Sequence, residues 1–210
     1  MKLRLGPILG MLGLAPAVSM AQFSGNVGYM SDYIFRGVFQ EDSSAMGGLD
    51  YEHDSGFYIG TWAADVGDGL ETDLYFGYGG SSGDFSYSIG FTGYFYTDDF
   101  DDTYQEINLG VGWAGLSLDF AAGEWDGFGA SQDYTFTSLG YEFPAGFYIT
   151  LGSWGDDFDG DYAELGYGFS WEEIDFSIAW VNSSDFFVSE DTFADNALTF
   201  SISKSFAIGE

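Results

Sequence analysis

The sequence predicts an all-β protein, a twelve-stranded antiparallel barrel that crosses a membrane. Three observations lead to this prediction. Apolar and polar residues alternate through most of the chain, which is the pattern of strands with two different faces. The connections between these strands alternate between short turns and longer acidic loops. The composition, with 22 Phe, 15 Tyr, 32 Gly and only 3 Pro, favours strands and turns over helices.

The first 21 residues have the pattern of a cleaved secretory signal peptide. Lys2 and Arg4 form a charged start, residues 5–18 are apolar, and residues 19–21 are a small-x-small cleavage site. The pattern predicts export and leaves residues 22–210 as the barrel domain. We find no second apolar stretch long enough for a membrane helix.

The charge balance of the chain excludes several classes of protein. Without the signal peptide, only Arg36 and Lys204 remain against 34 carboxylates. Nucleic-acid binding is excluded, because phosphate contacts require lysine and arginine. An aromatic content of 20% excludes disorder. The chain has no cysteine, so its stability must come from another source, and a closed hydrogen-bonded barrel is one.

Residues 26–40 predict the first strand and the start of the first loop. Val27 and Tyr29 share an apolar face, whereas Gly28 and Asp32 lie on the opposite, mostly polar face. We expect the apolar face to meet lipid. The acidic segment that begins at Gly37 is expected to form an external loop up to Ser44.

Strands two to six repeat this alternation, most regularly in residues 70–78. There, Leu70 and Leu74 share one face, and Glu71 and Asp73 share the other. The predicted segments are 45–52, 57–64, 70–78, 85–95 and 104–113.

Strands seven to twelve follow the same rule. In residues 116–122, for example, Leu116 and Leu118 lie opposite Ser117 and Asp119. The predicted segments are 116–122, 134–143, 147–154, 162–169, 174–180 and 197–203.

The connections place the two ends of the barrel on different sides of a membrane. Short periplasmic turns, longer external loops and an even number of strands are typical of outer-membrane barrels. Both termini then lie on the periplasmic side. A soluble jelly roll or an immunoglobulin-like sandwich is the alternative, and it predicts no such alternation. Short turns are predicted near residues 53, 80, 115, 145 and 171, and longer loops begin near 37, 65, 97, 123, 155 and 182.

The polar face of the strands carries many carboxylates, which we expect to point into the lumen. A lumen rich in carboxylates repels anions and concentrates cations, so an open barrel would be cation-selective. The alternative is that these groups are hydrogen-bonded or solvated filler of a narrow or closed interior. The candidate lumen and selectivity residues are Asp32, Arg36, Asp50, Glu52, Glu71, Asp73, Glu106, Asp119, Glu142, Glu164 and Asp175.

Arg36 is the single cation predicted for the interior. We expect it to pair with Asp32 or with an acid of a neighbouring strand near the outer mouth. The pair could stabilise the fold, or the charge could set ion selectivity.

Enzymatic activity is not expected. Some twelve-stranded barrels are lipases, but their chemistry needs a base beside a nucleophilic serine, usually histidine. The only histidine, His53, falls in a predicted turn. No pair of interior carboxylates is singled out for acid–base work, and no cofactor is expected.

Two loops gather oxygen ligands of the kind that Ca²⁺ and Mg²⁺ prefer. Neither has the spacing of an EF-hand, so no defined metal site is predicted. The loops could bridge divalent ions to lipopolysaccharide, or they could simply be solvated. The weak cation candidates are Asp98, Asp99, Asp101, Asp102, Asp157, Asp159 and Asp161.

Aromatic residues near the predicted strand ends fit the girdles that anchor barrels at the two membrane surfaces. The candidate anchors are Tyr33, Phe35, Trp113, Trp154, Trp171 and Trp180.

The segments NVGYMSDYIFRGVFQ (residues 26–40) and GGLDYEHDSGFYIGTWAADV (residues 47–66) resemble the opening of the TorF family of small proteobacterial porins. The resemblance is weaker but colinear up to the last strand. The family typically ends in a lysine, a small residue and a phenylalanine, matched here by Lys204, Ser205 and Phe206. This chain departs from the family by continuing beyond Phe206.

The resemblance implies a passive pore in the outer membrane, inserted by the barrel-assembly machinery. We therefore expect a porin or narrow channel for small, cationic or neutral solutes, surrounded by outer-membrane lipid and lipopolysaccharide and monomeric by default. The alternative from another class is a non-conducting structural or adhesin-like barrel whose acidic loops bind ions.

Overall fold

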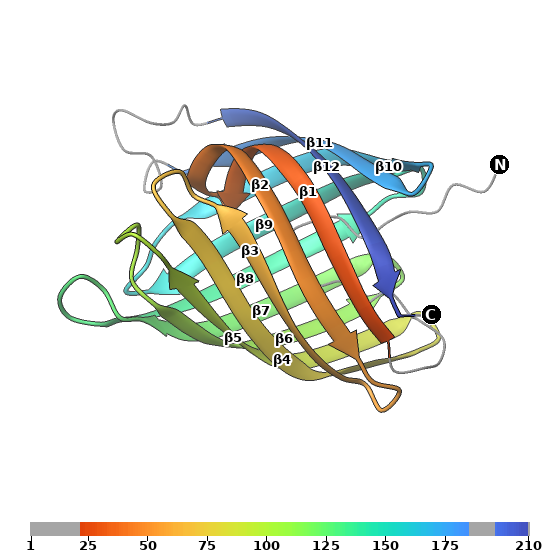
Figure 1. Cartoon of the computed structure of the whole chain (residues 1–210), viewed down its shortest axis with the longest axis horizontal. Helices are drawn as coiled ribbons and strands as arrows, with labels where there is room; N and C mark the ends of the chain where they lie inside the picture. Colours follow the sequence, from red (N-terminus) through yellow and green to blue (C-terminus); the bar gives the residue numbers. More distant parts are fainter. Residues whose placement is uncertain (1–21, 185–195, 210) are drawn as a thin grey trace.

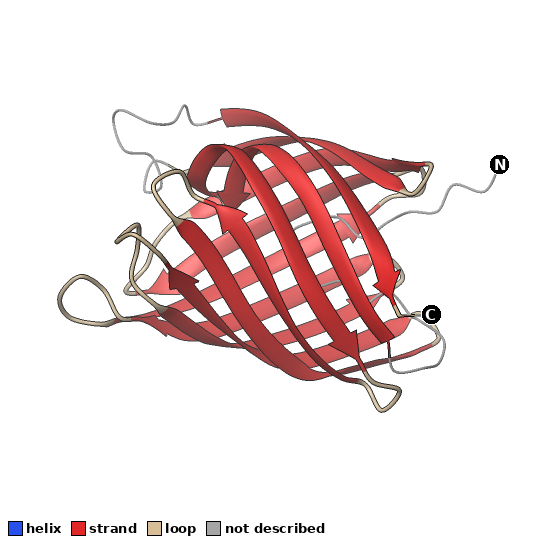
Figure 2. Ribbon diagram, viewed as in Figure 1, coloured by secondary structure: helices blue, strands red, loops and turns tan. Residues whose placement is uncertain are grey.

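The computed structural model of the protein describes residues 22–184 and 196–209. It confirms the predicted fold, since twelve antiparallel strands form one closed barrel (Figures 1 and 2). The predicted signal peptide and most of the last predicted loop lie outside the described residues. No helix in the described part of the chain is long and apolar enough to cross a membrane.

Each strand pairs with its neighbours in sequence, and β1 pairs with β12 to close the sheet. The closing register includes Phe23 opposite Ile208 and Met30 opposite Ser201. A closed barrel leaves no free sheet edge along its paired strands, so their backbone groups satisfy one another. The strands are β1 (Gln22–Phe35), β2 (Val38–Glu52), β3 (Phe57–Asp65), β4 (Leu70–Ser82), β5 (Phe85–Tyr96), β6 (Tyr104–Trp113), β7 (Leu116–Trp125), β8 (Gln132–Glu142), β9 (Phe147–Asp156), β10 (Asp161–Trp171), β11 (Ile174–Ser183) and β12 (Asn196–Ile208).

The two ends of the barrel differ only in part as the sequence predicts. At one end, here called the turn end, the chain makes its five short turns, and β1 begins beside the last residues of β12. At the other, the loop end, lie the connections after β3, β5, β7 and β9; those after β5 and β7 have seven and six residues, whereas those after β3 and β9 have four, as do the turns after β2 and β8. Figure 1 shows these loops on the left and the end of β12 at the lower right.

The outer surface of the barrel is a continuous apolar layer. Because side chains alternate across a strand, every second residue points outward, and along the middle of the strands these residues are large, apolar and exposed. They include Leu49, Ile59, Leu74, Phe76, Ile89, Ile107, Leu109, Leu139, Leu151, Leu165, Ile178 and Phe200.

Glycines on the inner face allow tyrosine rings to lie flat against the wall. A Cβ atom on Gly166 would lie 2.1 Å from the ring of Tyr148, and one on Gly152 would lie 2.1 Å from the ring of Tyr162. Any larger residue at these positions would push the ring into the lumen. The glycine-rich alternation thus positions the aromatic residues that line the interior.

The prediction of the first external loop is wrong. The sequence predicts an external loop over residues 37–44, but β2 begins at Val38, directly after the two-residue turn Arg36–Gly37. Both turn residues have positive φ, 50° and 83°, as a tight hairpin turn between twisted strands requires. The polar residues that suggest a loop instead pair with β1 and form a long hairpin.

An inward-folded hairpin as the candidate functional site

The tip of the β1–β2 hairpin leaves the barrel wall. The pairing of β1 with β12 ends at Met30, and the pairing of β2 with β3 begins at Met46. Between these points the two strands pair only with each other, from Asp32 opposite Asp42 to Phe35 opposite Val38. Nearer the tip, the register of this pairing shifts between Tyr33 and Ile34, as it does at a β-bulge. We call residues 31–44 the inward hairpin.

Side chains replace the lost ladder bonds where the inward hairpin departs from the wall. On the β12 side, the Thr199 hydroxyl donates to the carbonyl of Asp32 at 3.1 Å, and the backbone N–H of Phe200 donates to the Ser31 hydroxyl at 2.9 Å. On the β3 side, the buried Ser44 hydroxyl donates to the carbonyl of Asp65 at 2.7 Å. The hairpin base is therefore attached on both sides.

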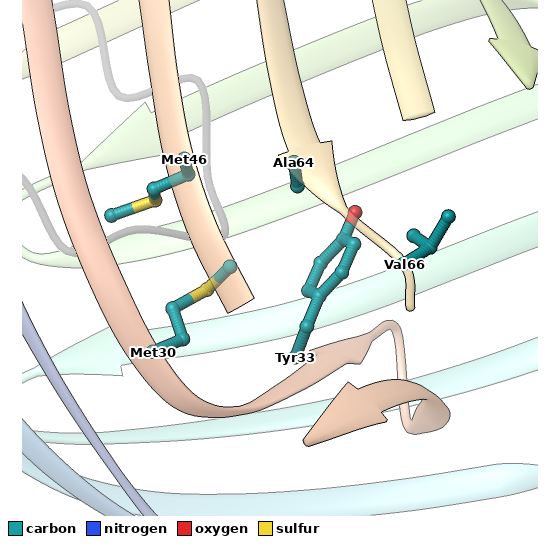
Figure 3. Packing of buried hydrophobic residues seen from close by; sticks show 5 residues of the cluster. All are labelled: Met30, Tyr33, Met46, Ala64 and Val66. Atoms are coloured by element: carbon teal, nitrogen blue, oxygen red, sulfur yellow. The ribbon is translucent and has the colours of Figure 1, made fainter. Parts of the chain in front are cut away.

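A buried apolar cluster fills the bend. It consists of Met30, Tyr33, Met46, Ala64 and Val66, with Phe35, Trp62 and Phe100 packed against it. Figure 3 shows β1 curving beneath Met30 and Tyr33 before it continues to the turn. Because this cluster must be dismantled to straighten β1, it stabilises the inward direction of the hairpin.

At the tip, Arg36 reaches the far wall of the barrel and binds Glu106 of β6. Its Nη1 donates to Glu106 Oε2 and its Nη2 to Oε1, both at 2.7 Å. Since β6 lies five strands from β1 around the barrel, the contact crosses the interior. Two parallel charge-assisted hydrogen bonds are the strongest common form of ion pair.

Glu106 is saturated by further donors from the wall. The hydroxyls of Tyr94 and Tyr134 donate to it at 2.7 and 3.0 Å, and the Asn108 side-chain amide donates at 2.6 Å. The Glu106 side chain has no exposed surface, whereas that of Arg36 keeps 16%. A buried carboxylate with these partners remains charged at low cost.

Aromatic rings enclose the guanidinium group. Its carbon lies 4.8 Å from the ring centre of Phe35, 4.5 Å from that of Phe136 and 5.7 Å from that of Trp154. These distances are within the range of cation–π attraction, which grows as water is excluded.

The backbone of the tip is anchored independently of the Arg36 side chain. The indole N–H of Trp154 donates to the Arg36 carbonyl at 3.0 Å, and the Ser183 hydroxyl donates to the Gly37 carbonyl at 2.7 Å. Gly37 also packs on Tyr162, because a Cβ atom there would lie 2.6 Å from the Tyr162 Cβ. Strands β6, β8, β9, β10 and β11 thus all contact the tip.

A second buried carboxylate, Glu71 of β4, lies under the hairpin. The Tyr33 hydroxyl donates to Glu71 Oε1 at 2.5 Å. Asp73 follows on the same face of β4 and is 9% exposed, and its Oδ1 has no hydrogen-bond partner in the described part of the chain. The structure therefore gathers three predicted lumen acids, Glu71, Asp73 and Glu106, around the inward hairpin.

The remaining predicted lumen residues lie apart from this site. Asp50 accepts a hydrogen bond from Tyr75, Glu164 from Tyr148 at 2.6 Å, and Asp175 from Ser170. Glu52 and Glu142 are exposed final residues of their strands at the turn end. Asp119 has a buried Oδ2 without a hydrogen-bond partner in the described residues, and Asp32 accepts a bond from the Ser31 hydroxyl at 2.7 Å.

The loop aspartates are divided between exposed and structural positions. Asp98 and Asp99 are exposed. Asp101 accepts hydrogen bonds from the Tyr104 hydroxyl and the Trp125 indole at 2.9 and 3.0 Å, and burial raises its pKa above the ordinary aspartate value.

The other loop aspartates bond to backbone N–H groups. Asp102 accepts from Thr103, Asp157 from Asp133 and Asp159 from Gly160, while Asp161 begins β10. Within residues 22–184 and 196–209, no group of three or more acidic or histidine side chains could hold a metal ion.

Three expectations about this region are wrong. Arg36 pairs with Glu106 on the far wall, and not with Asp32 or an acid of a neighbouring strand. Tyr33 and Phe35 are not membrane anchors, because the hairpin leaves the wall and carries both into the interior, where Tyr33 is 5% exposed.

Trp154 is also inside, at 8% exposure, because it packs against the hairpin tip. The predictions for Trp113, Trp171 and Trp180 agree with their exposed positions.

The residues that complete the site were not singled out from the sequence. Tyr94, Asn108, Tyr134 and Trp154 are separated from Arg36 by at least 58 positions, and nothing local connects them with it. One local signal was present. A glycine at 37 between two strand-forming runs is compatible with a two-residue hairpin turn, which would have placed Arg36 at a tip.

The arrangement leaves the two halves of the interior unequal. The loop half holds the hairpin, its aromatic neighbours and the buried acids. Toward the turn end, Tyr58 and Tyr148 point inward, and many other inward positions are small, including Ser86, Ser88, Gly110, Gly112, Ser117, Ser177 and Ser201. In chemical terms, the site can constrict a polar lumen and bind a cationic group.

Comparison with known proteins identifies both a family and a shared fold. Residues 14–206 match the profile of Gcw_chp, described as a bacterial protein of unknown function. No curated protein matches the sequence.

Several solved barrels share the fold of this protein although their sequences differ widely from it. The KdgM porin, alone and in complex with disordered oligogalacturonate, superposes with a TM-score of 0.59 at 10% identity, covering 89% of this chain and 99% of that one. A structure from work on the in-meso crystallization of membrane proteins gives a TM-score of 0.61 at 10% identity, covering 89% and 83%. At this identity the likeness establishes the fold alone.

Proposed function

The chain belongs to the Gcw_chp family of bacterial proteins of unknown function, and we propose that it acts as an outer-membrane porin. Small solutes, cationic or neutral, pass passively through its lumen past the inward hairpin. The observation that carries the proposal is the division of each strand between an apolar outer face and a polar, acidic inner face. Such a surface is unfavourable in water and suited to lipid.

The charge of the lumen supports a preference for cations. Carboxylates line it from Asp50 and Asp175 near the turn end to Glu71 and Asp73 beneath the hairpin, and Arg36 is neutralised by Glu106. Acidic groups in a confined space attract cations and exclude anions. The KdgM porin, by contrast, has been solved with oligogalacturonate. The shared fold therefore does not determine which solute passes, and we expect the residues that line the lumen to do so.

Conductance across a planar bilayer tests the proposal. We expect the purified protein, residues 22–210, to form small channels whose reversal potential in a potassium chloride gradient indicates preference for potassium. Replacing the lumen residues Asp119 and Glu164 by Asn and Gln should reduce this preference. The matched exterior change, Asp98→Asn with Asp99→Asn, should leave it nearly unchanged. Preference for chloride would contradict the proposed selectivity.

A second function is favoured by the inward hairpin itself. Because the hairpin joins opposite walls through Arg36 and Glu106, the barrel could be a non-conducting structural or adhesin-like protein. Its acidic loops would then bind ions or partners. Repeated reconstitution without channels, from protein shown to be folded, would favour this function over a porin.

Several further features belong to the same proposal. The protein is exported by a cleaved signal peptide, inserted by the barrel-assembly machinery and surrounded by outer-membrane lipid and lipopolysaccharide as a monomer. It has no catalytic role, and His53 is a turn residue whose Nδ1 accepts a hydrogen bond from the backbone of Ser55 at 3.1 Å. The relation to the TorF family rests on residues 25–66 and the Lys204–Phe206 ending.

A further inference from the structure

The wall of the barrel carries a site that fits a guanidinium group, either that of Arg36 or that of another molecule. The carboxylate of Glu106 faces it with both oxygens, which matches the planar fork of a guanidinium. Tyr94, Tyr134 and Asn108 hold that carboxylate in place. The rings of Phe136 and Trp154 lie within 6 Å of the bound group. All six residues belong to the wall.

The hairpin that carries the Arg36 side chain is anchored to the wall by contacts that do not involve this side chain. The backbone carbonyls of Arg36 and Gly37 are anchored by Trp154 and Ser183. The turn itself does not favour arginine, since a φ of 50° suits glycine or asparagine better. Neither the hairpin backbone nor the turn geometry therefore accounts for an arginine at this position, whereas the wall site does.

Arg36 is the more accessible member of the pair. Glu106 is sealed, but the Arg36 side chain keeps 16% of its surface exposed. Displacing a tethered group requires competition with its high effective concentration.

We propose that Glu106, with Tyr94, Tyr134, Asn108, Phe136 and Trp154, is a binding site for solutes that carry a guanidinium group, and that Arg36 is its tethered occupant. A solute of this class binds by displacing the Arg36 side chain. The inference rests on the proposed function only in taking the ligand to be a passing solute. Binding itself is measured without transport.

The experiment is calorimetric titration of methylguanidinium into the folded barrel in detergent. Arg36→Gly empties the site and also suits the positive φ. The matched control is the same protein with Glu106→Gln added. We expect binding to Arg36→Gly at least about tenfold tighter than to the control, because a bidentate charge-assisted pair is lost in the latter. The wild-type protein should bind more weakly than Arg36→Gly, since Arg36 competes.

Urea separates this site from general solvation, because it is planar, similar in size and uncharged. It should show no binding that depends on Glu106. Equal affinity of methylguanidinium for Arg36→Gly and the Glu106→Gln control would overturn the proposal, as would equal binding of urea and methylguanidinium.

A second variant guards against a folding defect. If Arg36→Gly does not fold, Arg36→Asn replaces it, because asparagine tolerates the same backbone conformation. In the wild-type protein, tryptophan emission should change with methylguanidinium and not with urea, since Trp154 stacks on the site. If neither binding to the Arg36 variants nor a change in the tryptophan emission of the wild-type protein is observed with methylguanidinium, the proposal is also overturned. A channel without methylguanidinium binding, or binding without a channel, would separate this inference from the porin function.

Discussion

Arg36 and Glu106 form the contact on which the interior depends most. The pair is bidentate, fully shielded on the Glu106 side and surrounded by rings and hydroxyls. Of the two roles expected for Arg36, this geometry favours a structural one, because its charge is neutralised by a dedicated partner. Removing one member of a buried ion pair lowers stability strongly, because the other charge stays buried without a partner. Replacing both members by neutral groups of similar shape does not.

This asymmetry predicts how three variants behave. Arg36→Gln should destabilise the protein by about 3–5 kcal/mol, since the charge of Glu106 is then buried without its cation. Glu106→Gln should have a similar effect. The double variant should lose clearly less than the sum of the two. The free energy of unfolding in urea, measured in lipid vesicles, checks these values. Additive losses would show that the two residues act independently.

The β1–β2 hairpin is the element that makes this barrel more than a wall of strands. Its wall pairs end at Met30 and Met46, and its tip is held by bonds to other strands. The closure of the barrel and the constriction are therefore separable. The inner part can be removed without breaking a pair between β1 and β12 or between β2 and β3.

Excision of the tip tests this separation. Replacing residues 33–41 by Asn-Gly between the paired Asp32 and Asp42, with Glu106→Gln to avoid an unpaired charge, should leave a folded barrel with severalfold larger single-channel conductance. Asn-Gly is the preferred two-residue turn. Shortening the exposed loop at residues 128–130 is the matched control and should not change conductance. Equal conductance of the excised and full-length proteins would show that the hairpin does not limit the pore.

The charge of the whole molecule acts over a longer range than any single pair. The formal net charge is −30, and the described part of the barrel has few basic side chains to balance its carboxylates. Arg36 is bound to Glu106, and Lys204 makes a looser, exposed contact with Glu173 at 3.4 Å. The field in and around the lumen is therefore negative, and mobile cations from solution must balance it.

Salt should weaken the selectivity of such a channel. The screening length falls from about 10 Å at 0.1 M to about 3 Å at 1 M salt. At constant gradient ratio, we expect the preference for potassium over chloride to decrease as total salt rises through this range. Reversal potentials at several salt levels measure it. A preference independent of salt would indicate that contact with one site, and not the summed charge, sets selectivity.

The local properties of this protein could be predicted from its sequence. Alternation in segments such as residues 70–78 predicted the strands and their faces, because side chains in a strand point alternately to the two sides. Leu74 is accordingly exposed and Glu71 buried. The order of turns and loops predicted antiparallel neighbours, and an even number of strands then allows closure with both termini at one end.

The sequence by itself thus determined which segments are strands and which of their faces is apolar. Only the tertiary structure decided where residues 31–44 go and what Arg36 binds. The pairing of β1 with β12 ends at Met30, and beyond this point the hairpin turns into the lumen and carries Tyr33 and Phe35 to the interior. The partners of Arg36 come from strands 58 or more positions away. They meet it because closing the barrel places β6, β8 and β9 across the lumen from β1, a distance relation that no local pattern contains.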